Sequence, residues 1–238
     1  MAEDPRVALK LAILERATPG DSAAVFGDMY VVEGAYTLRC LELGFGRVVL
    51  VDSLETPGWQ RLRLEHPALD FYKGDFSNAL FMRSIHETFD VTVCFDVLLH
   101  QPPLVHTIHL ILEKTRRRMC VVQPMLKERD TPNTLIYLPG NTDAGLYPLT
   151  ERSPEYNAFD PLAVNQSSWI WGITPSFLHN VLTGEGFTVT AEQVGPDLPN
   201  PQWFWYGCIA ERGEQNPQHW GEQRPPPGLY EPDWHPAS

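Results

Sequence analysis

Cysteine and positive charge are both scarce in this sequence. The chain has four cysteines among 238 residues, and no two of them form a CxxC pair. This usage predicts neither a disulfide framework nor a zinc site, and we find no other metal-ligand spacing. Lysine and arginine number 18 against 30 aspartates and glutamates, which gives a formal net charge of -12. Because nucleic-acid binding depends on neutralising phosphates, we expect no nucleic-acid partner and favour a small molecule.

Long hydrophobic runs are also absent. No apolar stretch approaches the roughly 20 residues needed to span a bilayer. Residues 1–5 lack the basic region and apolar run of a signal peptide, so we expect a cytoplasmic protein with no membrane partner. The one basic cluster, residues 114–118, is interpreted as the solvated end of a helix, where cations complement the helix dipole. The sequence leaves open whether the chain forms a homo-oligomer.

What the sequence does contain is a regular alternation of strand-like and helix-like segments. Residues 5–16 have apolar positions at helical spacing, and apolar, partly β-branched runs then alternate with amphipathic segments as far as residue 123. This alternation indicates an α/β fold with a doubly wound, mostly parallel sheet. The expected strands are 22–28, 47–52, 69–73, 90–95 and 119–123, and the expected helices between them are 34–43, 56–65, 78–86 and 104–114.

The second half of the sequence completes this sheet after an interruption. Residues 124–172 are irregular apart from a short strand at 134–138, and so long an irregular stretch is usually a lid or binding insertion. A helix at 174–183 precedes strands 187–194 and 204–212, whose short connection predicts an antiparallel pair. Seven strands in a Rossmann-like arrangement are therefore expected. We divide the chain into an N-terminal helix within 1–20, a main domain at 21–212 and an irregular tail at 213–238.

Acidic residues follow the first three expected strands, at Asp28, Asp52 and Asp75. Ligands of open α/β sheets bind outside the carboxyl ends of the strands, so these carboxylates are expected to face a ligand. Each also has a structural interpretation: a turn residue for Asp28, a helix N-cap for Asp75, and for Asp52 a strand-end acid of another dinucleotide fold. A nicotinamide-dependent enzyme is disfavoured, because residues 28–44 contain no GxGxxG motif.

Three segments at these strand ends carry a resemblance to a known family. Residues 48–53 (VVLVDS), 71–76 (FYKGDF) and 89–100 (FDVTVCFDVLLH) resemble successive cofactor motifs of the class I S-adenosylmethionine (SAM)-dependent methyltransferases. The likeness runs from about residue 23 to residue 212. It implies a SAM-dependent methyltransferase acting on oxygen or nitrogen of a small-molecule acceptor.

Segments in the second half narrow the resemblance. TLIYLPGN at 134–141, WGITP at 171–175 and LTGEGF at 182–187 are similar to the subgroup that contains the tRNA wobble-uridine carboxymethyltransferase. That subgroup also includes small-molecule and lipid methyltransferases. The tRNA enzyme carries a basic N-terminal extension that this sequence lacks, so a tRNA substrate is not expected.

The resemblance also implies roles for individual residues in a SAM site. Asp52, with Ser53 beside it, would accept hydrogen bonds from both ribose hydroxyls, as a carboxylate can. Asp75 would accept from the adenine amino group while Phe76 packs on the ring. Asp28 would orient the methionine ammonium. The further expected members of the cofactor site are Tyr30, Gly34 and Phe95.

The loop after the first strand departs from the family pattern of an acidic residue followed by three alternating glycines. In this chain Tyr30 and Val32 occupy the first two glycine positions, and only Gly34 remains. A β-branched valine resists positive φ, and a tyrosine ring could fill the volume of the methyl donor. Either the loop follows another path or cofactor binding is weakened. The alternative function is therefore a catalytically inactive methyltransferase-like protein that serves as a binding or partner subunit.

Candidate catalytic and acceptor-binding residues lie after the fourth strand and in the expected lid. His100 is a candidate base, with Asp96 either as the residue that orients it or as a contact on the cofactor side, although His100 could equally be the N-terminal residue of a helix. Tyr147, Trp169 and Trp171 could line an aromatic acceptor pocket. Aromatic residues are also what any lid would use for packing.

Overall fold

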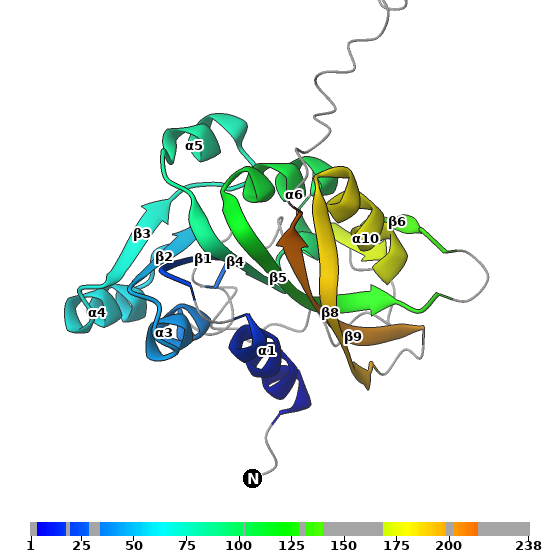
Figure 1. Cartoon of the computed structure of the whole chain (residues 1–238), viewed down its shortest axis with the longest axis horizontal. Helices are drawn as coiled ribbons and strands as arrows, with labels where there is room; N and C mark the ends of the chain where they lie inside the picture. Colours follow the sequence, from blue (N-terminus) through cyan, green and yellow to red (C-terminus); the bar gives the residue numbers. More distant parts are fainter. Residues whose placement is uncertain are drawn as a thin grey trace, which may run out of the picture.

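A seven-stranded sheet forms the centre of the protein. The structure is a computed structural model, and it describes residues 4–17, 20–28, 34–101, 103–128, 132–139, 169–198 and 202–213. The strands of this sheet are β1 (Ser22–Phe26), β2 (Arg47–Asp52), β3 (Leu69–Lys73), β4 (Phe89–Phe95), β5 (Thr115–Leu126), β8 (Phe187–Asp197) and β9 (Trp203–Arg212). Their order is β3-β2-β1-β4-β5-β9-β8 (Figure 1). Neighbours from β3 to β5 pair in parallel, and β9 is antiparallel to both β5 and β8. The predicted doubly wound, mostly parallel sheet is confirmed.

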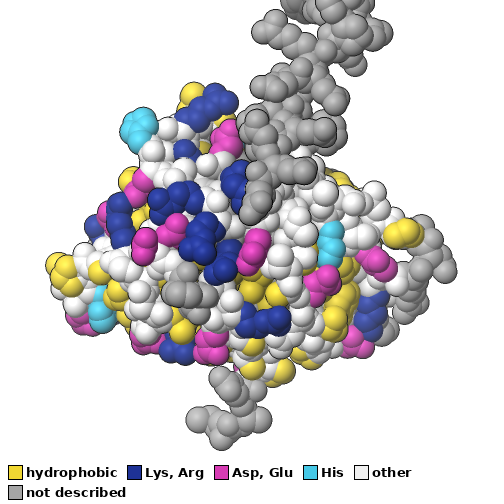
Figure 2. Space-filling model, viewed as in Figure 1, with side chains coloured by type: hydrophobic (Ala, Val, Ile, Leu, Met, Phe, Trp, Pro, Cys, Tyr) yellow, Lys and Arg dark blue, Asp and Glu magenta, His cyan; other side chains and the backbone are white. Residues whose placement is uncertain are grey.

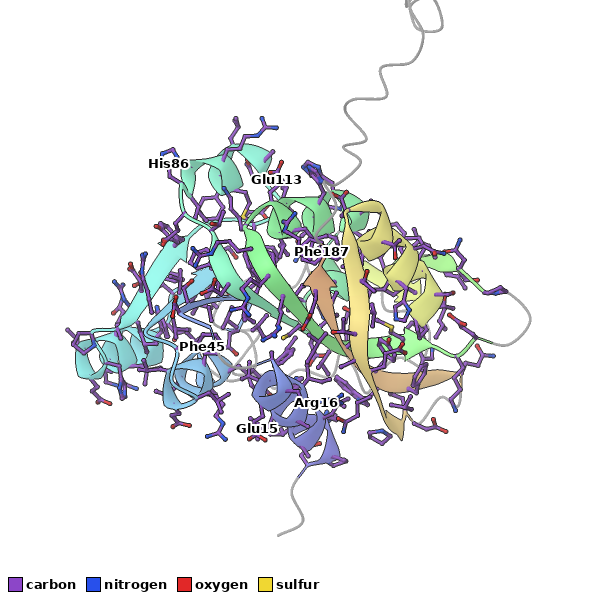
Figure 3. The ribbon with its side chains drawn as sticks, in the orientation of Figure 1. Glu15, Arg16, Phe45, His86, Glu113 and Phe187 are labelled. Carbon is purple, nitrogen blue, oxygen red and sulfur yellow. The ribbon has the colours of Figure 1, made fainter. Side chains whose placement is uncertain are left out.

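Helices cover both faces of this sheet. One face carries α1 (Pro5–Arg16), α3 (Ala35–Glu42) and α4 (Pro57–Glu65), and the other carries α5 (Ala79–Ser84), α6 (Leu104–Glu113) and α10 (Pro175–Gly184) (Figure 1). A short 3-10 helix, η1 (Leu98–His100), follows β4. Each face has its own apolar core; Phe45 belongs to the α1–α3–α4 side and Phe187 to the other side (Figure 3).

Local sequence explains where several helices begin. The Asp4 side chain accepts from Arg6 N at the start of α1, and Thr56 Oγ1 accepts from Trp59 N at 3.2 Å at the start of α4. Both helices have proline in the first turn, where its missing N–H costs nothing. Asn78 caps α5 through its side-chain oxygen. The predicted helices therefore form close to their expected bounds.

Strand β5 is longer than predicted at both ends. Lys114 is the C-cap of α6, as the interpretation of the basic cluster as a helix end expects, but its three arginines lie in the first residues of β5, and for them that interpretation is wrong. Arg118 instead pairs with Glu211 of β9 at 2.8 Å, directly across the ladder, and Arg116 pairs with Asp90 at 3.0 Å. Opposite charges across strands favour such an arrangement. Figure 2 likewise shows basic and acidic side chains interspersed on one face of the molecule.

A second, two-stranded sheet lies in the predicted insertion. The expected strand at 134–138 is confirmed as β6 (Leu135–Pro139), and it pairs antiparallel with β7 (Trp169–Ile173). Strand β7 was not predicted. It is fixed near the end of β4, because Trp171 Nε1 donates to the Gln101 carbonyl oxygen at 2.7 Å. Residues 140–168 and the tail from 214 lie outside the described residues. Among the helices that are described, none has both the length and the apolar character that crossing a membrane requires.

Candidate functional site

The carboxyl edge of the parallel strands brings acidic residues from β1, β2 and β4 together. Phe26 of β1 is level with Val51 of β2 and Cys94 of β4. Asp28, Asp52 and Asp96 therefore all lie within two residues of this line. Parallel strands end at the same edge, so Asp28 and Asp52 of the predicted acidic set lie near each other there. Asp96, which was predicted as a partner of His100 and not as a member of that set, lies at the same edge.

Asp28 is nearly inaccessible to solvent, at 5% exposure. Its Oδ2 accepts from the N–H of Thr37 at 2.7 Å and from the Thr37 hydroxyl at 2.8 Å, which ties the end of β1 to α3. Burial, with a smaller effect from the nearby charge of Asp52, raises the pKa of Asp28 to about 7 against the opposing effect of these hydrogen bonds. Its Oδ1 is buried and has no hydrogen-bond partner among the described residues. A cationic donor at this oxygen would relieve both the desolvation and the repulsion.

Asp52 ends β2 and is 1% exposed. Its Oδ1 accepts from Leu54 N at 3.0 Å, which holds the carboxylate against the turn that follows the strand. Its carbonyl oxygen accepts from Gly74 N at 2.9 Å, so the end of β3 is tied to the same point. Ser53, beside it, is exposed.

Asp75 and Phe76, which follow β3, both contact other residues of the fold. Asp75 is exposed, and its Oδ1 accepts from both the N–H and the hydroxyl of Ser77, at 2.8 and 2.7 Å. The N-cap of α5 is Asn78, so the N-cap alternative for Asp75 is wrong. Phe76 is 7% exposed and packs edge-to-face on Phe26, with ring centroids 5.7 Å apart.

Two glycines lie at the carboxyl edge of the sheet, Gly27 and Gly34, and only Gly34 was predicted as a member of the cofactor site. Gly34, the N-cap of α3, has φ 86°, and a Cβ there would lie 2.7 Å from the Trp59 ring. Gly27 has φ 71°, and a Cβ there would collide with Val97. Gly27 could have been predicted from the sequence, because it directly precedes Asp28 at the end of the first strand. Residues 29–33, which include Tyr30 and Val32, lie outside the described part of the chain.

A buried ion pair joins the N-terminal helix to this site. Lys10 Nζ of α1 lies 2.5 Å from Asp96 Oδ2, and the ammonium is 5.2 Å from the Tyr36 ring centroid and 5.5 Å from that of Trp205. Burial alone lowers the pKa of Lys10, but the charge of Asp96 more than offsets it and the pKa is raised. Burial raises the pKa of Asp96, opposed by Lys10. Sequence reasoning missed Lys10, because nothing local distinguishes it from other lysines on a helix.

The other predicted residues lie around η1. His100 ends this 3-10 helix and is half-buried, and the neighbouring Gln101 carbonyl receives the Trp171 indole. Trp169 is the first residue of β7. Phe95 is 6% exposed and packs edge-to-face on Tyr36 at 5.1 Å between centroids. Tyr147 lies outside the described residues.

Comparison with known proteins identifies this architecture. No protein-family model and no curated protein sequence matches the chain. Among solved structures, it is similar to the 1,6-didemethyltoxoflavin-N1-methyltransferase of Burkholderia thailandensis, solved with 1,6-didemethyltoxoflavin and S-adenosylhomocysteine (TM-score 0.60, 20% identity, 90% of this chain and 80% of that one). The fold is that of the class I methyltransferases.

Other structures of this fold differ in their chemistry. The magnesium protoporphyrin IX methyltransferase of Synechocystis PCC 6803, solved with S-adenosylhomocysteine, matches with a TM-score of 0.54 and 15% identity over 87% of this chain and 82% of that one. The [4+2]-cyclase SpnF matches with a TM-score of 0.58 and 12% identity over 88% and 81%. Because one fold hosts different reactions, the function of this chain must be argued from its site.

Proposed function

We propose that this protein is a SAM-dependent methyltransferase that methylates oxygen or nitrogen of a small molecule. The observation that carries the proposal is the pair of buried carboxylates, Asp28 and Asp52, at the carboxyl edge of β1 and β2. Buried acids need hydrogen-bonded or cationic partners, and Asp28 Oδ1 has none among the described residues. The ammonium of SAM would supply a cationic donor to this oxygen, and its ribose would bring hydroxyl donors to the buried carboxylate of Asp52.

Each candidate residue takes a role consistent with its position. Asp28 Oδ1 receives the methionine ammonium, and Asp52, with Ser53, receives the ribose hydroxyls. Asp75 binds the adenine amino group, and Phe76 borders the ring. The remaining contributors to the cofactor site are Phe95 at the end of β4, Gly34 at the N-cap of α3, and Tyr30, which precedes Gly34 in sequence.

The acceptor lies on the side of η1 and the two-stranded sheet. When bound, SAM supplies a methyl group on a positively charged sulfur. The protein aligns the acceptor with that group and excludes water, which is the main source of rate enhancement in such a transfer. His100 takes the proton from the acceptor, and Asp96, which is paired with Lys10, is a contact on the cofactor side. Residues 124–172 act as a lid, with Tyr147, Trp169 and Trp171 bordering the acceptor.

Calorimetric titration with SAM and with S-adenosylhomocysteine tests this proposal. The wild type should give a saturable heat, and Asp52→Asn should weaken binding at least about tenfold, because a hydrogen bond to a charged group contributes about 1.5–3 kcal/mol. Asp52→Asn keeps an oxygen for Leu54 N, so the turn is preserved. Asp70→Asn is the matched control: Asp70 lies on β3, its side chain is half-buried and it pairs with Arg47 at 3.0 Å. It should bind both ligands like the wild type.

The alternative function is a binding or partner subunit without catalysis. Tyr30 and Val32 at the glycine positions favour it, since both are bulkier than the residues they replace. A folded wild type that gives no heat with either ligand up to millimolar concentration would establish this alternative. Four predictions remain predictions. They are the narrower likeness to the carboxymethyltransferase subgroup, the division of the chain into helix, domain and tail, the cytoplasmic location, and a possible homo-oligomer.

A further inference from the structure

Gln123 is a buried polar residue that the fold does not explain. Its side chain is fully inaccessible to solvent, and neither Nε2 nor Oε1 has a hydrogen-bond partner among the residues that the structure describes. An amide buried in this way costs the full desolvation of a donor and an acceptor. Apolar residues precede and follow it on the same face of β5, and a leucine or methionine would fill such a position without that cost. The amide therefore calls for a partner outside the protein.

The position of Gln123 places that partner beside the proposed methyl-transfer site. Val122, its neighbour in β5, accepts from the N–H of Asp96 at 2.9 Å, so Gln123 is level with the start of the β4–η1 turn. Beyond this point β5 has only β9 beside it, because the β4 ladder ends at Phe95. Gln123 therefore lies at the carboxyl edge of the parallel strands, which is where the proposed function places the acceptor.

The Gln123 side chain points to the face of the main sheet on which β7 packs. Successive residues of a strand alternate between faces, and Val121 and Met125 both belong to the core on the α6–α10 side. Trp171 of β7 packs against that core. The Gln123 amide therefore faces the side on which β7 and η1 lie, among aromatic and aliphatic groups.

We propose that Gln123 recognises the methyl acceptor through a lactam-like edge, in which a ring N–H and a carbonyl stand side by side. A primary amide offers one acceptor oxygen and N–H donors, so it pairs with such an edge through two parallel hydrogen bonds. The apolar and aromatic surroundings suit a flat ring. This inference rests on the proposed function for the identity of the site, and it adds the chemical class of the acceptor.

The neighbouring Tyr206 does not offer the same chemistry. It lies directly opposite Gln123 in the β5–β9 ladder and is 1% exposed. Its hydroxyl already bonds His179 Nε2 at 2.6 Å, beneath α10. Tyr206→Phe is therefore a matched control, since it removes a polar group adjacent to Gln123 that has its own partner.

Saturation-transfer NMR with 2-pyridone tests the inference on the full chain, with and without S-adenosylhomocysteine. 2-Pyridone carries the N–H and carbonyl of a lactam, whereas N-methyl-2-pyridone lacks the donor. The wild type should bind 2-pyridone at least about tenfold more tightly than the N-methyl compound, as expected for one lost hydrogen bond to a buried group. Gln123→Met should abolish the difference, and Tyr206→Phe should keep it.

A second readout separates recognition from a structural role. Gln123→Met removes an unpaired buried amide at nearly constant volume, so its Tm should equal or exceed that of the wild type. A lower Tm with unchanged 2-pyridone binding would make Gln123 a structural residue and overturn the inference, as would a wild type that binds neither pyridone. If pyridone binding depends on Gln123 while SAM gives no heat, the inference stands and the proposed function fails.

Discussion

At the scale of single residues, the site depends on polar groups held where water cannot reach them. Asp28 is the clearest case, with one oxygen satisfied by Thr37 and the other without a partner. The sequence predicted its place after the first strand, because the strand pattern and the acid are both local. Its burial and its raised pKa depend on α3 folding back over the strand end, which no local pattern encodes.

Asp28 should make the stability of the protein depend on pH. Its folded pKa, about 7, is above the ordinary value of 3.8, so between about pH 4 and pH 7 the folded state holds more protons than the unfolded state. Stability should therefore fall as pH rises through this window, by at most about 1.4 kcal/mol per pH unit. Urea unfolding at pH 4.5, 6 and 7.5 measures it.

The control for that experiment is Asp28→Asn, whose amide oxygen can still accept from Thr37. This variant should lack the pH-dependent contribution of Asp28 to the free energy of unfolding. The wild type should therefore lose stability relative to Asp28→Asn as pH rises. Parallel pH profiles of the two proteins would mean that Asp28 keeps an ordinary pKa.

At the scale of elements, α1 illustrates what a helical pattern predicts and what it does not. The apolar spacing and Pro5 gave the helix its bounds, which the structure reproduces. The partner of α1 was not predictable, because Lys10 and Asp96 are 86 positions apart in sequence. Two ion pairs attach this helix to the domain: the buried Lys10–Asp96 pair and the exposed pair between Glu15 and Arg39 of α3.

These two ion pairs should differ in their contribution to stability. Lys10→Met leaves Asp96 without its counter-charge and should lower the free energy of unfolding by about 2 kcal/mol or more, since breaking a buried pair is costly. Arg39→Met should cost less than about 1 kcal/mol, as for most exposed pairs. Urea unfolding of both variants measures the difference.

A double variant separates charge from packing in that comparison. Adding Asp96→Asn to Lys10→Met removes the isolated carboxylate and should recover much of the lost stability. If the double variant is no more stable than Lys10→Met, the loss comes from the packing of the lysine stem on Tyr36 and Trp205.

Strand β5 shows how a local signal can mislead. The expected strand stopped at Gln123, before the irregular stretch that begins with Pro124. The strand nevertheless continues to Leu126. Proline cannot donate to a ladder, but beyond the end of β4 the described strand beside β5 is β9, so an N–H missing on the β4 side breaks no strand pairing. The extension adds Met125 to the face of β5 on which Gln123 lies.

At the scale of the whole molecule, two sheets of unequal stability meet at η1. Strands β1, β4 and β5 have a neighbour on both sides and helices on both faces, whereas β6 and β7 pair only with each other. A two-stranded sheet is marginal alone. Among the described residues, β7 is tied to the rest of the domain by Trp171, which donates to the Gln101 carbonyl oxygen after η1, by Gly172, which packs close to Leu126, and by Ile173, which is buried in the core on the α6–α10 side.

Hydrogen exchange should therefore separate the two sheets. Amides of β6 and β7 should exchange at least about tenfold faster than those of β1 and β4, because a small unit can open without global unfolding. Mass spectrometry of peptides covering each strand measures this. Equal protection in the two sheets would mean that the two-stranded sheet opens only when the domain unfolds, which would contradict its proposed action as a lid.

The succession of strands and helices and the acids at the strand ends could be predicted from the sequence. Both follow from residues close together in the chain: the hydrophobic period, the turn residues, and the rule that parallel strands end at one edge. Four features could be seen only in the folded chain: Lys10 meets Asp96, Gly27 packs under Val97, the arginines of the basic cluster lie in a strand, and Gln123 is buried with no partner among the described residues. These depend on which distant segments pack together, and packing is a property of the whole chain.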